Sequence, residues 1–147
     1  MRNLKSTIIF ILSLACVILA SCNNEQNVDC FQCVTHQPDS AYLLIYSTIN
    51  NENPKVLINI YKSKYNINNP PVVALIDTLK LSTQRIKVPV GYFYSVKAIY
   101  KVGTDTVAAI DGDNLSITKV KAACDSVCWT INGGQINVRL KYTKVKN

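Results

Sequence analysis

The chain is marked by short runs in which apolar and polar side chains alternate. The clearest run covers residues 135–142, where the apolar positions are Ile136, Val138, Leu140 and Tyr142. Successive side chains of a β-strand point to opposite faces, so this run predicts a strand with one buried and one wet face.

The same alternation predicts a strand at residues 92–102, with Tyr94 and Tyr100 among its inward side chains. Residues rich in Val, Ile, Leu and Tyr predict further strands at 41–49, 56–62, 72–79, 86–90, 105–110 and 115–120. No helical period longer than one turn is found in this part of the chain.

Turn-forming residues separate the predicted strands. Gly, Pro, Asn and Asp gather at residues 53–54, 66–71, 91, 102–104, 111–114 and 132–134. About eight strands spaced in this way predict an all-β domain over residues 41–147, built as one antiparallel two-sheet β-sandwich.

The first residues follow a different pattern. Arg2 and Lys5 precede an apolar run at residues 8–20, which ends in the small residues Ala20 and Ser21. This is the layout of a secretory signal peptide, expected to be helical and to cover residues 1–21. The apolar run is shorter than the roughly 20 residues that a membrane-spanning helix needs.

The four residues Leu19-Ala20-Ser21-Cys22 resemble the lipobox of bacterial lipoproteins. The resemblance implies that the thiol of Cys22 receives a diacylglycerol and that the signal is cleaved before it, so Cys16 leaves with the signal. Two or more acyl chains hold a protein stably on a membrane. Residues 22–40 then form a polar tether that includes the first cysteine pair. Asn23 after the lipidated residue is compatible with the outer membrane of the cell envelope.

Composition and charge limit the classes of partner that the protein is expected to bind. The chain of 147 residues has a formal charge of +7, which becomes +5 once Arg2 and Lys5 are removed. A mild basic excess outside the cytoplasm favours anionic headgroups, acidic glycans or an envelope protein over nucleic acid. The length after the signal suits one domain.

Four cysteines remain after the lipidated one: Cys30, Cys33, Cys124 and Cys128. An even number in an exported chain favours two disulfides. Bridges between the early and the late pair would close loops of roughly 90 residues and stabilise by about 4–5 kcal/mol, more than local bridges would. The C-x-x-C spacing of Cys30 and Cys33 leaves a thiol-redox centre as an alternative.

Metal sites are a second alternative for these residues. The two cysteine pairs are compatible with a structural zinc, with His36 as a spare ligand. Residues 111–114, together with Asp105, offer oxygen ligands for calcium, but the spacing differs from an EF-hand and a turn explains it as well. We therefore expect no metal or other cofactor, and a solvated His36.

Catalytic motifs are absent from the sequence, and no pair of carboxylates is spaced for acid–base chemistry. Exposed aromatic side chains are common platforms for glycans and proteins. The candidates for such a binding surface are Trp129, Phe31, Tyr61 and Tyr65.

Two resemblances agree with this picture. Residues 88–96, VPVGYFYSV, resemble the first strand residues of prealbumin-like sandwich domains, in which a glycine makes the turn and a tyrosine enters the core. The sandwich is therefore expected to be prealbumin-like or Ig-like. The order of CFQC, the long central β segment and CDSVCW resembles small lipoproteins of Bacteroidota-type bacteria. The sequence thus predicts a non-catalytic binding or structural module anchored in the envelope. An accessory subunit for glycan, peptide or protein, or a thiol or zinc protein, is the alternative.

Overall fold

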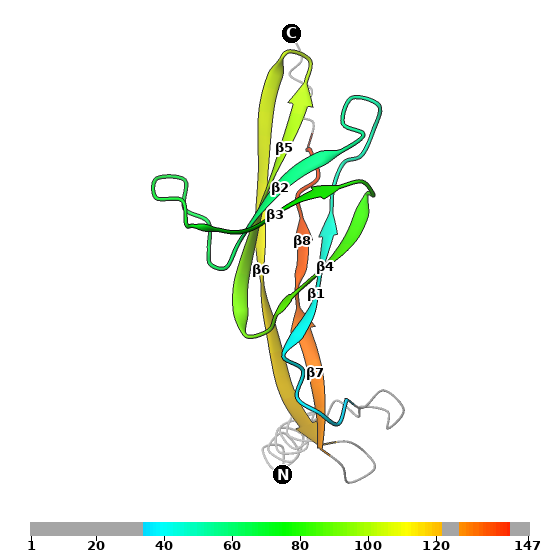
Figure 1. Cartoon of the computed structure of the whole chain (residues 1–147), viewed down its shortest axis with the longest axis vertical. Helices are drawn as coiled ribbons and strands as arrows, with labels where there is room; N and C mark the ends of the chain where they lie inside the picture. Colours follow the sequence, from blue (N-terminus) through cyan, green and yellow to red (C-terminus); the bar gives the residue numbers. More distant parts are fainter. Residues whose placement is uncertain (1–33, 122–126, 142–147) are drawn as a thin grey trace, which may run out of the picture.

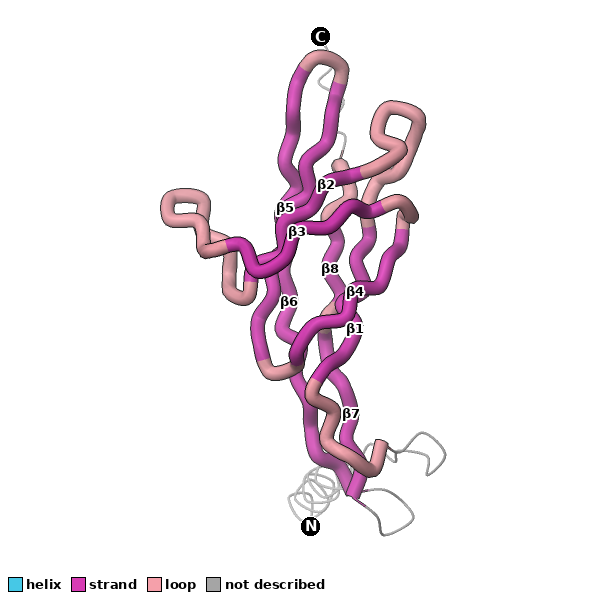
Figure 2. Tube along the Cα trace, in the orientation of Figure 1, coloured by secondary structure: helices cyan, strands magenta, loops and turns pink. Residues whose placement is uncertain are grey.

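The computed structural model describes residues 34–121 and 127–141, which are strands and loops throughout (Figure 2). The predictions for the signal peptide, Cys22, Phe31 and Tyr142 lie outside these residues. The described residues form eight strands: β1 (Ser40–Tyr46), β2 (Val56–Tyr61), β3 (Val73–Leu79), β4 (Thr83–Pro89), β5 (Tyr92–Val102), β6 (Asp105–Lys121), β7 (Val127–Gly133) and β8 (Gln135–Asn137).

The strands form two open sheets, which confirms the predicted all-β sandwich (Figure 1). One sheet has the order β4-β1-β8 and the other β3-β2-β5-β6-β7. The expectation of purely antiparallel pairing is wrong at one place, because β8 runs parallel to β1. Parallel neighbours require a crossover rather than a hairpin. Here the chain crosses from β7 in the other sheet to β8, which pairs with β1.

The core lies between the sheets and includes the predicted inward positions of β5 and β8. β1 contributes Leu43 and Ile45, and β5 contributes Tyr94 and Tyr100, all at most 2% exposed. Each fully buried aliphatic side chain stabilises the fold by roughly 1.5–3 kcal/mol. The other core residues are Ala41, Val56, Ile58, Ile60, Leu79, Ile86, Val88, Val96, Ala98, Leu115, Ile136 and Val138.

Strand β6 corrects the prediction of a turn at residues 111–114. The strand is continuous over 17 residues, and the glycine within it has a packing reason. A Cβ atom on Gly112 would lie 2.7 Å from the carbonyl oxygen of Tyr94 and 2.8 Å from a ring carbon of Phe93. Gly112 therefore makes room for its cross-strand neighbours, as glycines within strands often do.

The last two strands differ from the sequence interpretation. β7 has no counterpart among the predicted strands, although Val127, Trp129 and Ile131 alternate with smaller residues in the sequence. The run at residues 135–142 pairs as a strand only over β8, yet Val138 remains fully buried. Its predicted inward face is confirmed as far as the described residues extend.

The glycine pair Gly133-Gly134 carries the chain from one sheet to the other. Both residues have positive φ angles, 75° and 78°, a conformation that glycine adopts readily. A Cβ on Gly133 would overlap the carbonyl oxygen of Asn114, and one on Gly134 would lie 2.8 Å from Leu115. In the described part of the chain, no helix has the length and hydropathy to cross a membrane.

Candidate functional site

A loop after β2 is fastened to the sheet by one buried hydroxyl. Ser95 on β5 is 2% exposed. Its Oγ donates a hydrogen bond to the carbonyl oxygen of Ser63 at 2.7 Å and accepts one from the backbone N–H of Tyr65 at 2.9 Å. Both backbone groups of the loop are satisfied by one side chain, so the backbone at Tyr65 is held against the sheet.

Three lysines lie over aromatic rings around the end of β2 and the start of β5. The Nζ atom of Lys62 is 3.3 Å from the ring centroid of Tyr92. Lys64 is 5.4 Å from the ring of Phe93, and Lys97 is 5.8 Å from that of Tyr65. We call these six residues the aromatic–lysine cluster. Tyr92 and Phe93 are consecutive on β5, so their side chains leave opposite faces of the strand. Each pair is within the range of a cation–π interaction.

Tyr61 contacts the cluster through the ring of Tyr65. It is 4% exposed, and its ring meets that of Tyr65 edge to face, with the centroids 5.1 Å apart and the planes at 61°. This arrangement is a favourable one for aromatic pairs. Tyr65 is half-buried and Tyr92 is 44% exposed, so the cluster presents ring surface as well as charge to solvent.

Basic residues outnumber acidic ones in the part of the sequence that holds the cluster. Between Asn53 and Thr104, Asp77 is the only residue with a carboxylate side chain. The same stretch contains the basic residues Lys55, Lys62, Lys64, Lys80, Arg85, Lys87, Lys97 and Lys101. The acidic residues of β6 lie beside β5, with Asp113 opposite Tyr94 and Asp111 opposite Val96, and their carboxylates accept N–H groups of β8. The basic excess of this stretch favours anionic partners.

Burial also changes one tyrosine next to the cluster. The Tyr94 hydroxyl donates a hydrogen bond to the carbonyl oxygen of Pro89 at 2.7 Å. Burial raises the pKa of Tyr94, and the neighbouring Tyr92 raises it further. Tyr94 thus stays neutral and structural, while its neighbour Tyr92 faces solvent.

The structure brings together two of the four aromatic residues proposed from the sequence. Tyr61 and Tyr65 are in contact. Trp129 lies on β7, where it pairs with Lys119 and with Val34, and is not part of the cluster. The sequence interpretation missed the lysines and Tyr92 and Phe93. The alternation of Tyr and Lys at residues 61–65, in a stretch almost free of acids, was the available signal.

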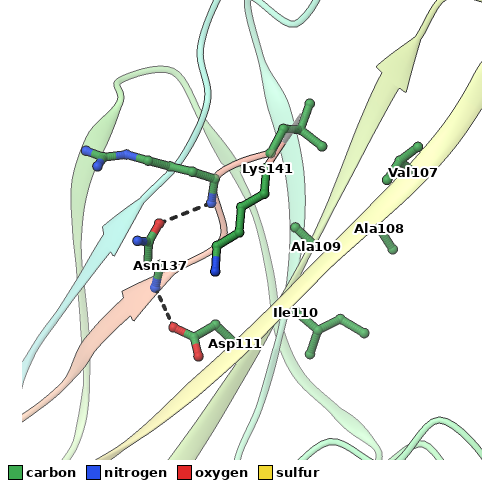
Figure 3. A pocket seen from close by; sticks show the side chains of 9 residues that line it. Val107, Ala108, Ala109, Ile110, Asp111, Asn137 and Lys141 are labelled. Carbon is green, nitrogen blue, oxygen red and sulfur yellow. Dashed lines mark hydrogen bonds between the residues drawn. The ribbon is translucent and has the colours of Figure 1, made fainter. Parts of the chain in front are cut away.

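A groove lies between β6 and the residues that follow β8 (Figure 3). This groove has a volume of about 400 Å³. Asp111, which lines the groove, accepts the backbone N–H of Asn137 at 2.7 Å, and the nearby Asp113 accepts that of Gln135 at 3.0 Å. The groove is lined by Val107, Ala108, Ala109, Ile110, Asp111, Asn137, Arg139, Leu140 and Lys141.

The other candidate residues provide no metal site in the described part of the chain. No group of three His, Cys, Asp or Glu side chains is placed there to hold an ion. The carboxylates of Asp111 and Asp113 are engaged by β8, which weakens the calcium interpretation. His36 is exposed. Cys128 is fully buried on β7, whereas Cys30, Cys33 and Cys124 lie outside the described residues, so their pairing stays a prediction.

The fold and the cluster define an open β-sandwich with a basic, aromatic surface at the end of β2. No model of a known protein family, no curated protein and no solved structure matches the chain. Its function must therefore be inferred from its own residues.

Proposed function

We propose that the protein is a lipid-anchored lipoprotein of the cell envelope that acts as a non-catalytic binding module, and that its aromatic–lysine cluster binds an acidic glycan. The observation that carries the proposal is the seating of three lysines on aromatic rings within a stretch that has one carboxylate. Such a surface offers charge and flat apolar area together.

The two components suit a sugar acid. Aromatic rings stack on the apolar faces of sugar rings, and lysine ammonium groups pair with carboxylate or sulfate groups. The hydrogen bonds of Ser95 hold Tyr65 in place before the ligand arrives, which reduces the entropy that is lost on binding.

The anchor belongs to the same proposal. The lipobox resemblance at Leu19-Ala20-Ser21-Cys22 supports lipidation of Cys22, and Asn23 supports an outer-membrane location. The tether at residues 22–40 would hold the sandwich near the membrane surface, where anionic glycans and lipid headgroups lie. We also propose that the sandwich is prealbumin-like, from the resemblance of residues 88–96, and that two disulfides join the early and late cysteine pairs.

The test is retention of the soluble domain on immobilised heparin and on polygalacturonate. The double substitution Lys62→Gln with Lys64→Gln should weaken binding by about two- to thirty-fold, since each exposed ionic contact contributes about 0.2–1 kcal/mol. Lys80→Gln with Lys87→Gln is the matched control, because both lysines are exposed and the charge change is the same. Equal loss in both variants would contradict a localised site.

Two further arms separate sugar stacking and lipid binding from simple attraction. Tyr65→Ala should lower retention, and Tyr42→Ala, at a position 56% exposed on the other sheet, should not. Binding to vesicles of phosphatidylglycerol tests whether the cluster binds anionic lipid headgroups. Tight binding to these vesicles without retention on either polysaccharide would replace the glycan in the proposal by a lipid surface.

A further inference from the structure

Strand β6 is longer than the strands that pair with it. On one side, β5 pairs with β6 from Asp105 to Leu115. On the other side, β7 pairs only from Leu115 to Lys121. Among the strands that the structure describes, none pairs with this second edge between Asp105 and Asn114, although β8 lies beside it at Asp111 and Asp113, whose carboxylates accept its N–H groups. The first half of β6 therefore has an open edge.

The backbone groups on this edge can be identified by alternation. Trp129 donates its N–H to Val34, away from β6, at 3.0 Å, so Trp129 and Lys119 form a pair without mutual hydrogen bonds. The even-numbered residues of β6 then face β7, because the two kinds of pair alternate along an antiparallel ladder. The same parity directs the N–H and C=O groups of Thr106, Ala108, Ile110 and Gly112 toward the open edge.

Other edges of the molecule carry side-chain protection that this one lacks. On β3, Asp77 accepts the N–H of Thr78 at 2.7 Å, and on β8 the two carboxylates of β6 accept outward N–H groups. Exposed edges are commonly blunted by Lys, Pro or a bulge. Between Asp105 and Asp111, the unpaired edge of β6 has small and apolar residues, including Ile110, which is 42% exposed.

The groove beside this edge has the chemistry of a strand-binding site. Its lining includes the apolar Ala109 and Leu140 and the basic Lys141, whereas the guanidinium of Arg139, which also lines it, lies 5.1 Å from the ring centroid of Tyr46 on β1. Figure 3 shows the Lys141 side chain extending between the two walls. The carboxylates nearby are already engaged by β8. An added strand would thus meet apolar surface and positive charge.

We infer that an extended, acidic segment of a different protein adds to β6 as a strand along Thr106–Gly112. Main-chain hydrogen bonds would give affinity, and the groove would select alternate side chains. A second copy using the same edge is disfavoured, because the symmetric pairing that overlaps the full edge places Asp105 opposite Asp113 twice, and like charges in such pairs are destabilising.

The first experiment measures amide hydrogen exchange in the free protein by NMR. The N–H groups of Ala108 and Ile110 should exchange much faster than those of Val107 and Ala109, which pair with β5. Equal protection of all four amides would overturn the inference, since it would mean that the edge is already covered.

The second experiment adds a synthetic peptide of about nine residues that alternates valine and glutamate. It should slow exchange at Ala108 and Ile110 by about tenfold or more, and a valine–lysine peptide should do so less. No added protection by the glutamate peptide, or equal protection by both, would contradict an acidic partner strand.

The matched variants are Ala108→Pro and Ala108→Ser. Proline removes an N–H that the fold does not use and is tolerated on edge strands, so it should abolish peptide binding and leave the domain folded. Serine keeps the N–H and should bind the peptide as the unaltered protein does. Binding that survives Ala108→Pro would show that the peptide lies elsewhere.

Discussion

Tyr100 connects three parts of the molecule at the scale of a single residue. Its side chain lies on β5 and is fully buried. Its hydroxyl donates a hydrogen bond to the carbonyl oxygen of Val138 at 2.8 Å and accepts one from the N–H of Thr48 at 3.2 Å. These partners follow β8 and β1, so one hydroxyl links the two sheets through the core.

Removal of this hydroxyl should leave two backbone groups without their partner. An unsatisfied buried polar group costs about 1–3 kcal/mol, so Tyr100→Phe should lower the free energy of unfolding by that order, measured by urea denaturation. Tyr42→Phe is the control, because Tyr42 is 56% exposed, and it should change stability little. A loss that is the same in both variants would contradict the role of the buried hydrogen bonds.

Stability should depend on the two buried tyrosines at high pH. Burial raises the pKa of Tyr100 above its ordinary value of 10.0, and the Thr48 hydrogen bond opposes part of this rise; Tyr94 shifts in the same direction. The folded state then holds protons that the unfolded state loses, so the stabilisation is complete below pH 10 and decreases as pH rises through the folded pKa.

Urea unfolding between about pH 9 and pH 11 measures this decrease. The double variant Tyr94→Phe with Tyr100→Phe should show a shallower decrease than the unaltered protein, since the lysines titrate in both. Parallel curves for the two proteins would show that these hydroxyls do not control the alkaline limit of stability.

At the scale of the elements, the crossing from β7 to β8 depends on two glycines. Gly91 also has a positive φ angle, 85°, but its missing Cβ would meet nothing within 4 Å. At Gly133, a Cβ would meet the backbone of Asn114 instead. Backbone strain and steric overlap are thus separable by comparing these positions.

Gly91→Ala should cost about 1 kcal/mol of unfolding free energy from backbone strain alone. Gly133→Ala should cost more, by about 1–3 kcal/mol, because Asn114 would have to move and β6 with it. Thermal unfolding of the two variants measures the difference. If Gly133→Ala were the milder of the two, the close approach of β7 and β6 would not control this crossing.

Sequence pattern located most elements because burial follows the period of the strand. The alternation at residues 92–102 predicted both the strand and the burial of Tyr94 and Tyr100. It failed at residues 111–114, where Asp, Gly and Asn are typical of turns. There the carboxylates accept N–H groups of β8, and the glycine leaves room for the Phe93 ring. These are tertiary contacts, which local propensity does not predict.

At the scale of the whole molecule, lipid and disulfides remain to be measured on the mature protein. Mass spectrometry without reduction should find acyl chains on Cys22 and a chain that begins there. The mass should also show two disulfides among Cys30, Cys33, Cys124 and Cys128, with peptide mapping to connect the early and late pairs. Free thiols at Cys30 and Cys33 would instead support a thiol-redox centre, and an uncleaved signal would contradict the lipid anchor at Cys22.

The sequence by itself determined that the domain is all-β and which side chains of residues 92–102 and 136–138 face its core, because a two-residue period is a local property; it did not predict that Tyr61 is buried. It also supplied the basic excess and two of the aromatic residues. Only the tertiary structure decided that β8 lies parallel to β1, that Tyr65 docks on Ser95 from 30 positions away, and that half of one edge of β6 stays open. These features depend on which distant segments share a layer, and pairing between distant segments is set by packing of the whole chain.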